Sequence, residues 1–141
     1  MPRVSAVSLR DRKKAGEKIA VLTAYDFPTA KLIDQSGVDV VLVGDSLGMV
    51  VMGRENTLSV TMDEMVYHTR IVSSAVEHAL VVGDMPFLSY QISPQEAVRN
   101  AGRLIAEGGA QAVKLEGPAQ RFGNTIQAIL DASIPVMGHI G

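Results

Sequence analysis

The stretch Val40-Val41-Leu42-Val43-Gly44-Asp45-Ser46 decides the fold that we expect for this chain. A short apolar run rich in valine, followed by glycine and a carboxylate, predicts a buried parallel strand that ends in a polar turn. Two later stretches, 80–84 and 112–116, repeat this pattern. Ligands of α/β folds bind at the carboxyl ends of parallel strands. Chemistry is therefore expected beside the three acids that close these runs: Asp45, Asp84 and Glu116.

Helical patterns separate the apolar runs, and several of them open on recognisable start signals. The signals are Asp26 with Pro28, the capping-box pattern of Thr61 with Glu64, and that of Ser93 with Glu96. We expect strands at 19–24, 38–44, 80–84, 111–116 and 135–140. Helices are expected at 26–37, 61–76, 93–108 and 119–132. Residues 5–18 should form a charged, solvated helix or arm, and 46–60 a long loop.

The composition excludes several classes of protein. The 141 residues carry 13 basic and 15 acidic side chains, a net charge of −2, with no basic cluster to bind nucleic acid. No uninterrupted apolar stretch of about 18 residues predicts a membrane span, and no signal peptide is evident. Without cysteine, any metal must be held by oxygen or imidazole. We therefore expect a soluble, cytoplasmic α/β protein.

Three carboxylates at neighbouring strand ends predict a site for a divalent cation, because such ions prefer oxygen ligands. Lys114 shares a strand face with Glu116 and needs an anionic partner, which either Glu116 or a bound anion would supply. A purely structural Lys114–Glu116 ion pair is the alternative. Ser46, with the backbone N–H groups that follow it, suits an anionic oxygen or simply stabilises the turn.

Other polar residues near the strand ends have simpler explanations. Asp26 is explained by helix capping and is left out of the site. Tyr25 could face the strand ends or serve as a structural hydroxyl, and His139 lies at the same rim as the acids. His68 and His78 are expected to be structural or surface residues.

Six short motifs follow one another along the chain: Thr23-Ala24-Tyr25-Asp26, Val43-Gly44-Asp45-Ser46-Leu47-Gly48, Tyr67-His68-Thr69, Asp84-Met85-Pro86-Phe87, Val113-Lys114-Leu115-Glu116-Gly117 and Gly138-His139-Ile140-Gly141. With these motifs in this order, the chain resembles the ketopantoate hydroxymethyltransferase family along nearly all of its length. The resemblance implies a (β/α)8 TIM barrel of the phosphoenolpyruvate/pyruvate-binding kind, assembled as a homodecamer. It also implies transfer of a hydroxymethyl group from 5,10-methylenetetrahydrofolate to 3-methyl-2-oxobutanoate, giving 2-dehydropantoate for pantothenate synthesis.

The resemblance assigns roles to the strand-end residues. Asp45 and Asp84 would bind Mg²⁺ and the substrate, and Glu116 would complete the metal site directly or through water. Ser46 and Lys114 would bind the carboxylate of the 2-oxo acid. Magnesium would act as a Lewis acid that stabilises the enolate formed when a base removes the C3 proton.

One part of the family pattern has no counterpart in this sequence. Family members continue beyond the motif at His139 and supply the general-base glutamate on a later strand, past Gly141. We therefore expect 1–141 to be a single incomplete barrel domain of about five βα units, with the C-terminal units missing. Such a chain should hold no catalytic base, be inactive alone and expose two sheet edges.

Two other functions remain open at this point. A magnesium-dependent lyase acting on a 2-oxo acid, from the same barrel group, would need a similar site without folate. A phospho-receiver signalling domain also has five βα units with strand-end acids and a lysine. Its lysine, however, belongs on the fifth strand, whereas Lys114 falls on the fourth.

Overall fold

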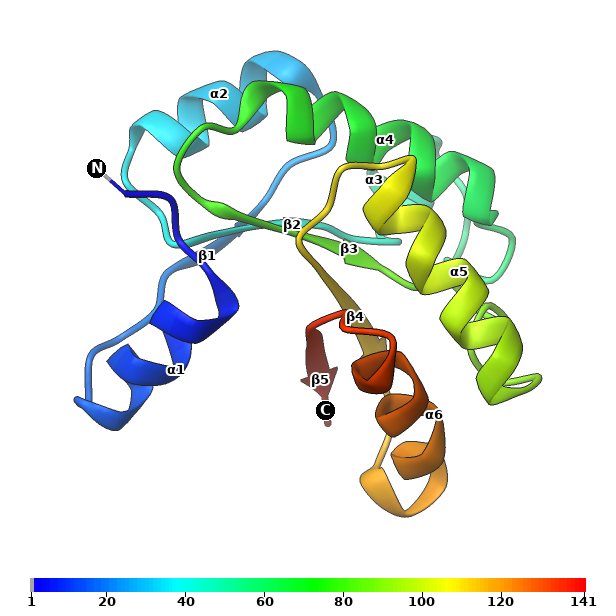
Figure 1. The fold of residues 1–141 in the computed structure, drawn as a ribbon. Coiled ribbons are helices and arrows are strands. Elements are labelled where there is room, and N and C mark those ends of the chain that lie inside the picture. The colour runs from blue at the N-terminus through cyan, green and yellow to red at the C-terminus, as the bar shows by residue number, and fades with distance from the viewer. Residues whose placement is uncertain (1) are drawn as a thin grey trace.

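The computed structural model describes residues 2–141 as a curved, five-stranded parallel sheet with helices on both sides (Figure 1). Neighbouring strands follow chain order, β1-β2-β3-β4-β5. The strands are β1 (Val21–Thr23), β2 (Val40–Val43), β3 (Leu80–Asp84), β4 (Ala112–Glu116) and β5 (Val136–His139). The helices are α1 (Ala6–Lys14), α2 (Phe27–Gln35), α3 (Leu47–Val50), α4 (Met62–Ala75), α5 (Pro94–Ala106) and α6 (Ala119–Asp131).

The main core lies between the outer face of the sheet and helices α2, α4, α5 and α6 (Figure 1). Val81, Val113 and Leu115 point into it and are almost completely buried. The alternate residues Val82 and Ala112 face the concave side, where they form a separate apolar cluster. This alternation along the strands puts the side chain of Asp84, two residues beyond Val82, on the concave side of the sheet.

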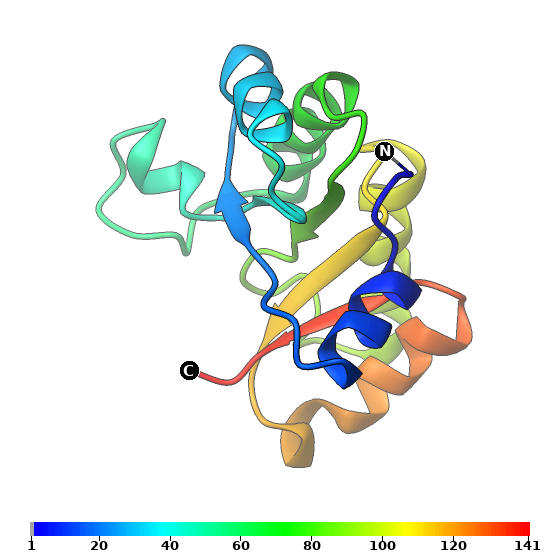
Figure 2. The ribbon, with the colours of Figure 1, turned by 90° about the vertical axis from the view of Figure 1, so that its left-hand side faces the viewer.

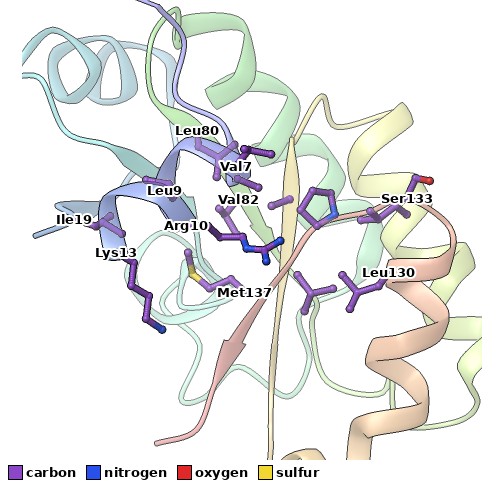
Figure 3. A pocket seen from close by; sticks show the side chains of 15 residues that line it. Val7, Leu9, Arg10, Lys13, Ile19, Leu80, Val82, Leu130, Ser133 and Met137 are labelled. Atoms are coloured by element: carbon purple, nitrogen blue, oxygen red, sulfur yellow. The ribbon is translucent and has the colours of Figure 1, made fainter. Parts of the chain in front are cut away.

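Helix α1 covers part of the concave side near the amino ends of the strands. Leu9 packs on the inner cluster, and the helix borders an apolar cavity of about 680 Å³ (Figure 3). Leu80, Val82 and Met137 line the sheet side of this cavity. The expected solvated arm is therefore only partly solvated: α1 has no fully buried residue, and Val7 is exposed, yet Leu9 packs on the sheet.

The predicted helix starts are formed by the expected side chains. Asp26 caps α2 by accepting from Thr29 N–H at 2.8 Å, and Thr61 and Glu64 form a complete capping box on α4. Ser93 caps α5 by accepting from Glu96 N–H at 3.1 Å. Within the described chain, the Glu96 carboxylate does not accept the reciprocal hydrogen bond from the Ser93 N–H. The second predicted capping box is therefore only half present.

The segment 46–60, predicted to be a loop, contains the short helix α3 and projects from the body of the molecule (Figure 2). Buried Leu47 anchors α3, whereas Met49 and Val50 are exposed. Arg54 holds the later part through Glu64, with its Nη1 2.9 Å from Glu64 Oε2. Four residues of helix have no periodicity that a sequence pattern could reveal.

The strand order rules out one of the functions considered. A phospho-receiver domain has a doubly wound sheet in which β1 lies inside, with order 2-1-3-4-5. Here β1 lies at the edge, and the sheet continues in chain order as in a barrel wall. No helix within residues 2–141 is long and apolar enough to cross a membrane.

Candidate active site

The carboxyl ends of β2, β3 and β4 surround a cavity of about 430 Å³. It lies at the opposite end of the strands from the apolar cavity beside α1. Its polar lining includes four residues expected at the site, Asp45, Asp84, Lys114 and Glu116, together with Thr57, Gln91 and Arg121. The structure therefore brings the three predicted acids and the lysine together, although the larger cavity lies elsewhere and carries no acid.

Asp84 is the centre of this polar lining. Its Oδ1 accepts a hydrogen bond from Lys114 Nζ at 2.7 Å, and its Oδ2 accepts from the Asp45 backbone N–H at 3.1 Å. The Asp84 side chain is only 9% exposed and that of Lys114 17%. One carboxylate thus joins the ends of three strands in a largely buried ion pair.

Glu116, one of the two partners expected for Lys114, does not pair with it. Glu116 lies on the same strand, about 6.6 Å along it, whereas Asp84 is the direct cross-strand neighbour of Lys114. The closer carboxylate, on the adjacent strand, forms the ion pair. Glu116 instead has a side chain that is 63% exposed, with its Oε2 3.3 Å from Nδ1 of His139 on β5.

Asp45 follows β2 and is half-buried beside Asp84. Burial raises the pKa of the Asp45 carboxyl, and the negative charge of Asp84 raises it further, while Lys114 acts in the opposite direction. A carboxyl group in this position gains from a nearby cation, which would offset both effects. The cavity is lined by three carboxylates and by two basic side chains, Lys114 and Arg121, so negative charge is in excess by one.

Ser46 does not line this cavity, but it adjoins it. Its hydroxyl lies 2.8 Å from the Tyr25 hydroxyl. A Cβ added to Gly44 would lie 2.8 Å from Ser46 Oγ and 3.7 Å from Asp84 Oδ2. A side chain at position 44 would therefore displace the Ser46 hydroxyl from its present place.

The donor set fits a magnesium ion that shares its coordination with a bound ligand. Among residues 2–141, no three acidic or imidazole side chains lie close enough together to hold a metal by themselves. Mg²⁺ is usually bound by one or two carboxylates, with waters and substrate oxygens completing its shell. Asp45 and Asp84 could supply such carboxylates, and Glu116 lines the same cavity.

Sequence comparison identifies the relatives of this chain. The family model described as ketopantoate hydroxymethyltransferase matches residues 3–141. The chain belongs to the ketopantoate hydroxymethyltransferase family. It is 60% identical over 141 residues to the 3-methyl-2-oxobutanoate hydroxymethyltransferase of Syntrophomonas wolfei subsp. wolfei, covering 100% of this chain and 51% of the relative. The enzyme of that name from Thermoanaerobacter sp. (strain X514) is 59% identical, with 99% of this chain and 50% of the relative covered.

The chain therefore spans about half the length of these hydroxymethyltransferases. Solved structures confirm the fold of this family member. Phosphonopyruvate hydrolase has a TM-score of 0.75 at 16% identity, covering 94% of this chain and 50% of the hydrolase. A 2,3-dimethylmalate lyase of the PEP mutase/isocitrate lyase superfamily has a TM-score of 0.70 at 19% identity, covering 96% and 52%. The family members named above are hydroxymethyltransferases, which disfavours the lyase alternative.

Several residues at the cavity of this ketopantoate hydroxymethyltransferase family member are not evident from sequence patterns. Tyr90 is buried, lines the cavity and packs edge-on against Phe122 at 5.3 Å between ring centroids. Its hydroxyl donates to the Glu116 carbonyl at 3.1 Å and lies 3.3 Å from the Glu116 N–H as acceptor. The only sequence signal is an aromatic residue in a loop after a strand, which is too common to be diagnostic.

His68 and His78 make structural contacts of the kind expected for them. His68 Nδ1 donates to the Tyr25 carbonyl at 2.8 Å, and His78 Nδ1 lies 3.2 Å from Asp34 Oδ2. His139 remains at the rim beside Glu116.

Proposed function

We propose that this protein transfers a hydroxymethyl group from 5,10-methylenetetrahydrofolate to 3-methyl-2-oxobutanoate, giving 2-dehydropantoate in pantothenate synthesis. The observation that carries the proposal is the cavity that gathers Asp45, Asp84, Lys114 and Glu116, in a chain 60% identical to a relative of that name. The proposal includes Mg²⁺ as cofactor, a cytoplasmic location and a homodecameric assembly.

The cavity residues suit a small 2-oxo acid. Lys114 supplies the positive charge that attracts the substrate carboxylate, and Ser46 supplies a hydrogen-bond donor. Asp84 fixes the lysine ammonium by accepting from it at 2.7 Å, so that the ammonium is held in place before the substrate binds. Asp45 and Asp84 would hold Mg²⁺, and Glu116 would complete its surroundings directly or through water. Bound there, the ion supplies Lewis-acid polarisation of the keto group, which makes the C3 proton easier to remove.

Turnover also needs a base, which typically contributes a factor of about 10²–10⁴. Since the chain spans about half the length of its relatives, we propose that residues 1–141 bind the 2-oxo acid and that a further segment completes the reaction.

The test uses three readouts: ligand binding, C3 proton exchange and product formation. Binding of 3-methyl-2-oxobutanoate is measured by calorimetry with and without Mg²⁺, and C3 proton exchange is followed by NMR in deuterated water. Exchange and product formation are assayed with the chain alone and mixed with the part of the Syntrophomonas wolfei relative outside the aligned half. We expect magnesium-dependent binding by the chain, and exchange and folate-dependent product only in the mixture.

Asp84→Ala should abolish both binding and exchange, because it removes the carboxylate that orients Lys114 and the proposed metal. Asp11→Ala, at an exposed acid on α1, is the matched control and should change neither. Near-normal exchange by Asp84→Ala in the mixture would refute the metal and substrate assignments.

A further inference from the structure

We propose that Tyr25 is a positioning residue: it holds the Ser46 hydroxyl so that the serine proton is directed at the carboxylate of a bound 2-oxo acid. The inference rests on the function proposed above, since that function supplies the anionic ligand. It adds a residue from β1's end to a site otherwise built from the ends of β2, β3 and β4.

The Ser46 hydroxyl is oriented by Tyr25 and not by its own helix. Ser46 is the N-cap residue of α3, yet its side chain makes no capping hydrogen bond. Within residues 2–141, the hydrogen-bond partner recorded for Ser46 Oγ is the Tyr25 hydroxyl, at 2.8 Å and partly buried. This hydrogen bond favours one rotamer of the serine side chain.

The backbone that carries Tyr25 is fixed on both sides. Ala24 N–H donates to the Leu42 carbonyl at 3.1 Å, which ties the end of β1 to β2. The Tyr25 carbonyl accepts from His68 Nδ1 at 2.8 Å, which ties it to α4. Asp26 then caps α2. The phenol therefore projects from a backbone with little freedom, as a positioning group requires.

The Ser46 hydroxyl also adjoins the charged centre of the site. Gly44 lies between this hydroxyl and Asp84: a Cβ added to the glycine would lie 2.8 Å from Ser46 Oγ and 3.7 Å from Asp84 Oδ2. A ligand carboxylate paired with Lys114 Nζ, which is bound to the other oxygen of Asp84, would lie near this hydroxyl.

The direction of the Tyr25–Ser46 hydrogen bond follows from the ligand. A carboxylate only accepts hydrogen bonds, so Ser46 must donate to it. The serine oxygen can then accept from the Tyr25 hydroxyl, giving a chain of two bonds that polarise each other. Because a hydrogen bond contributes about 0.5–1.5 kcal/mol net, loss of the tyrosine hydroxyl should weaken binding roughly 2- to 12-fold.

A double-mutant cycle tests this inference on the full chain. Calorimetry measures the affinity for 3-methyl-2-oxobutanoate with Mg²⁺ in Tyr25→Phe, Ser46→Ala and the double variant. Denaturant unfolding without metal or ligand measures their stability. We expect each single variant to bind more weakly, the double variant to bind no more weakly than Ser46→Ala, and unfolding to show coupling between the two hydroxyls. Tyr67→Phe, whose ring is exposed on α4, is the control and should match the unsubstituted protein.

The cycle separates the possible failures. Unchanged affinity in Tyr25→Phe would overturn the inference while leaving the proposed function intact. The inference would also be overturned if Tyr25→Phe weakened binding by the same factor in the Ser46→Ala protein as in the unsubstituted protein. That result would indicate a general structural role for Tyr25. Absence of 2-oxo acid binding by the unsubstituted chain would instead overturn the proposed function, and this inference with it.

Discussion

The Asp84 carboxylate performs two tasks with its two oxygens. One oxygen neutralises Lys114 and the other accepts the backbone N–H of Asp45, so a single side chain connects the ends of β2, β3 and β4. Since both members of the ion pair are largely buried, neither is well solvated when its partner is removed.

Replacing Asp84 by asparagine should therefore destabilise the protein. Asparagine keeps the size but loses the charge that compensates Lys114, and a hydrogen bond to a charged group contributes about 1.5–3 kcal/mol. We expect the free energy of unfolding in urea at neutral pH to fall by that amount. Lys114→Met added to Asp84→Asn should restore part of the loss. An Asp84→Asn protein as stable as an Asp11→Asn control would contradict the role of this pair.

Tyr90 makes the second prediction at the residue scale. Its hydroxyl pairs with both backbone polar groups of Glu116 at the end of β4, and burial raises the pKa of its phenol. Tyr90→Phe leaves both groups without that partner, so we expect unfolding to become about 1–3 kcal/mol easier. Tyr67→Phe, exposed on α4, should have no measurable effect. Equal denaturation midpoints for the two variants would show that this hydroxyl is not needed.

Sequence patterns predicted the site residues that are placed by the end of their own strand. They missed residues whose role depends on contacts with segments distant in the sequence. Asp45, Asp84 and Lys114 could be placed because strand ends converge at one edge of a parallel sheet. Tyr90 could not, because it contacts a backbone 26 residues away. The role of Asp34 could not be predicted either. Burial alone would raise the pKa of the Asp34 carboxyl, but hydrogen bonds from the backbone N–H groups of residues 77–79 outweigh burial, so the net effect is a lowered pKa.

At the scale of elements, local start signals predicted the helices well. Asp26, Thr61 and Ser93 each cap the helix expected from them, since a cap needs only neighbours three residues away. Helix α3 was missed because it has only four residues and is anchored by the burial of Leu47, a tertiary contact.

The Arg54–Glu64 pair holds the segment after α3 against the start of α4, and it should make stability depend on pH. The Arg54 guanidinium, together with the Thr61 backbone N–H, lowers the pKa of Glu64 from 4.5 to about 2. A carboxylate with a lowered pKa stabilises the folded state fully above about pH 4.5. That contribution is lost as the pH falls toward 2.

Glu64→Gln should remove this part of the acid dependence. We expect unfolding free energies of the two proteins to differ most above pH 4.5 and to converge toward pH 2. Glu96→Gln is a matched control, because Glu96 occupies the same third position of α5 but contacts Arg99 only at 3.8 Å on the surface. Parallel pH profiles for the Glu64→Gln protein and the unsubstituted one would contradict the prediction.

At the scale of the whole molecule, the sheet is curved but open. Within residues 2–141, β1 pairs only with β2, and β5 pairs only with β4. Val21 is 43% exposed and Leu22 49%, so the β1 edge combines unpaired backbone groups with apolar side chains. Exposed edges of this kind form intermolecular strand pairs, which charged side chains discourage.

We therefore expect the 141-residue chain to self-associate in a concentration-dependent manner, as sedimentation velocity would measure. Leu22→Lys should shift the distribution toward monomer, because it places a charge on the β1 edge at a half-exposed position. Leu32→Lys is the matched control: Leu32 is 69% exposed on α2, away from any strand edge, so the same substitution there should leave association unchanged. If the unsubstituted chain sediments as a single monomer at all concentrations, the edge does not recruit a partner. An equal effect of both lysines would instead attribute association to net charge.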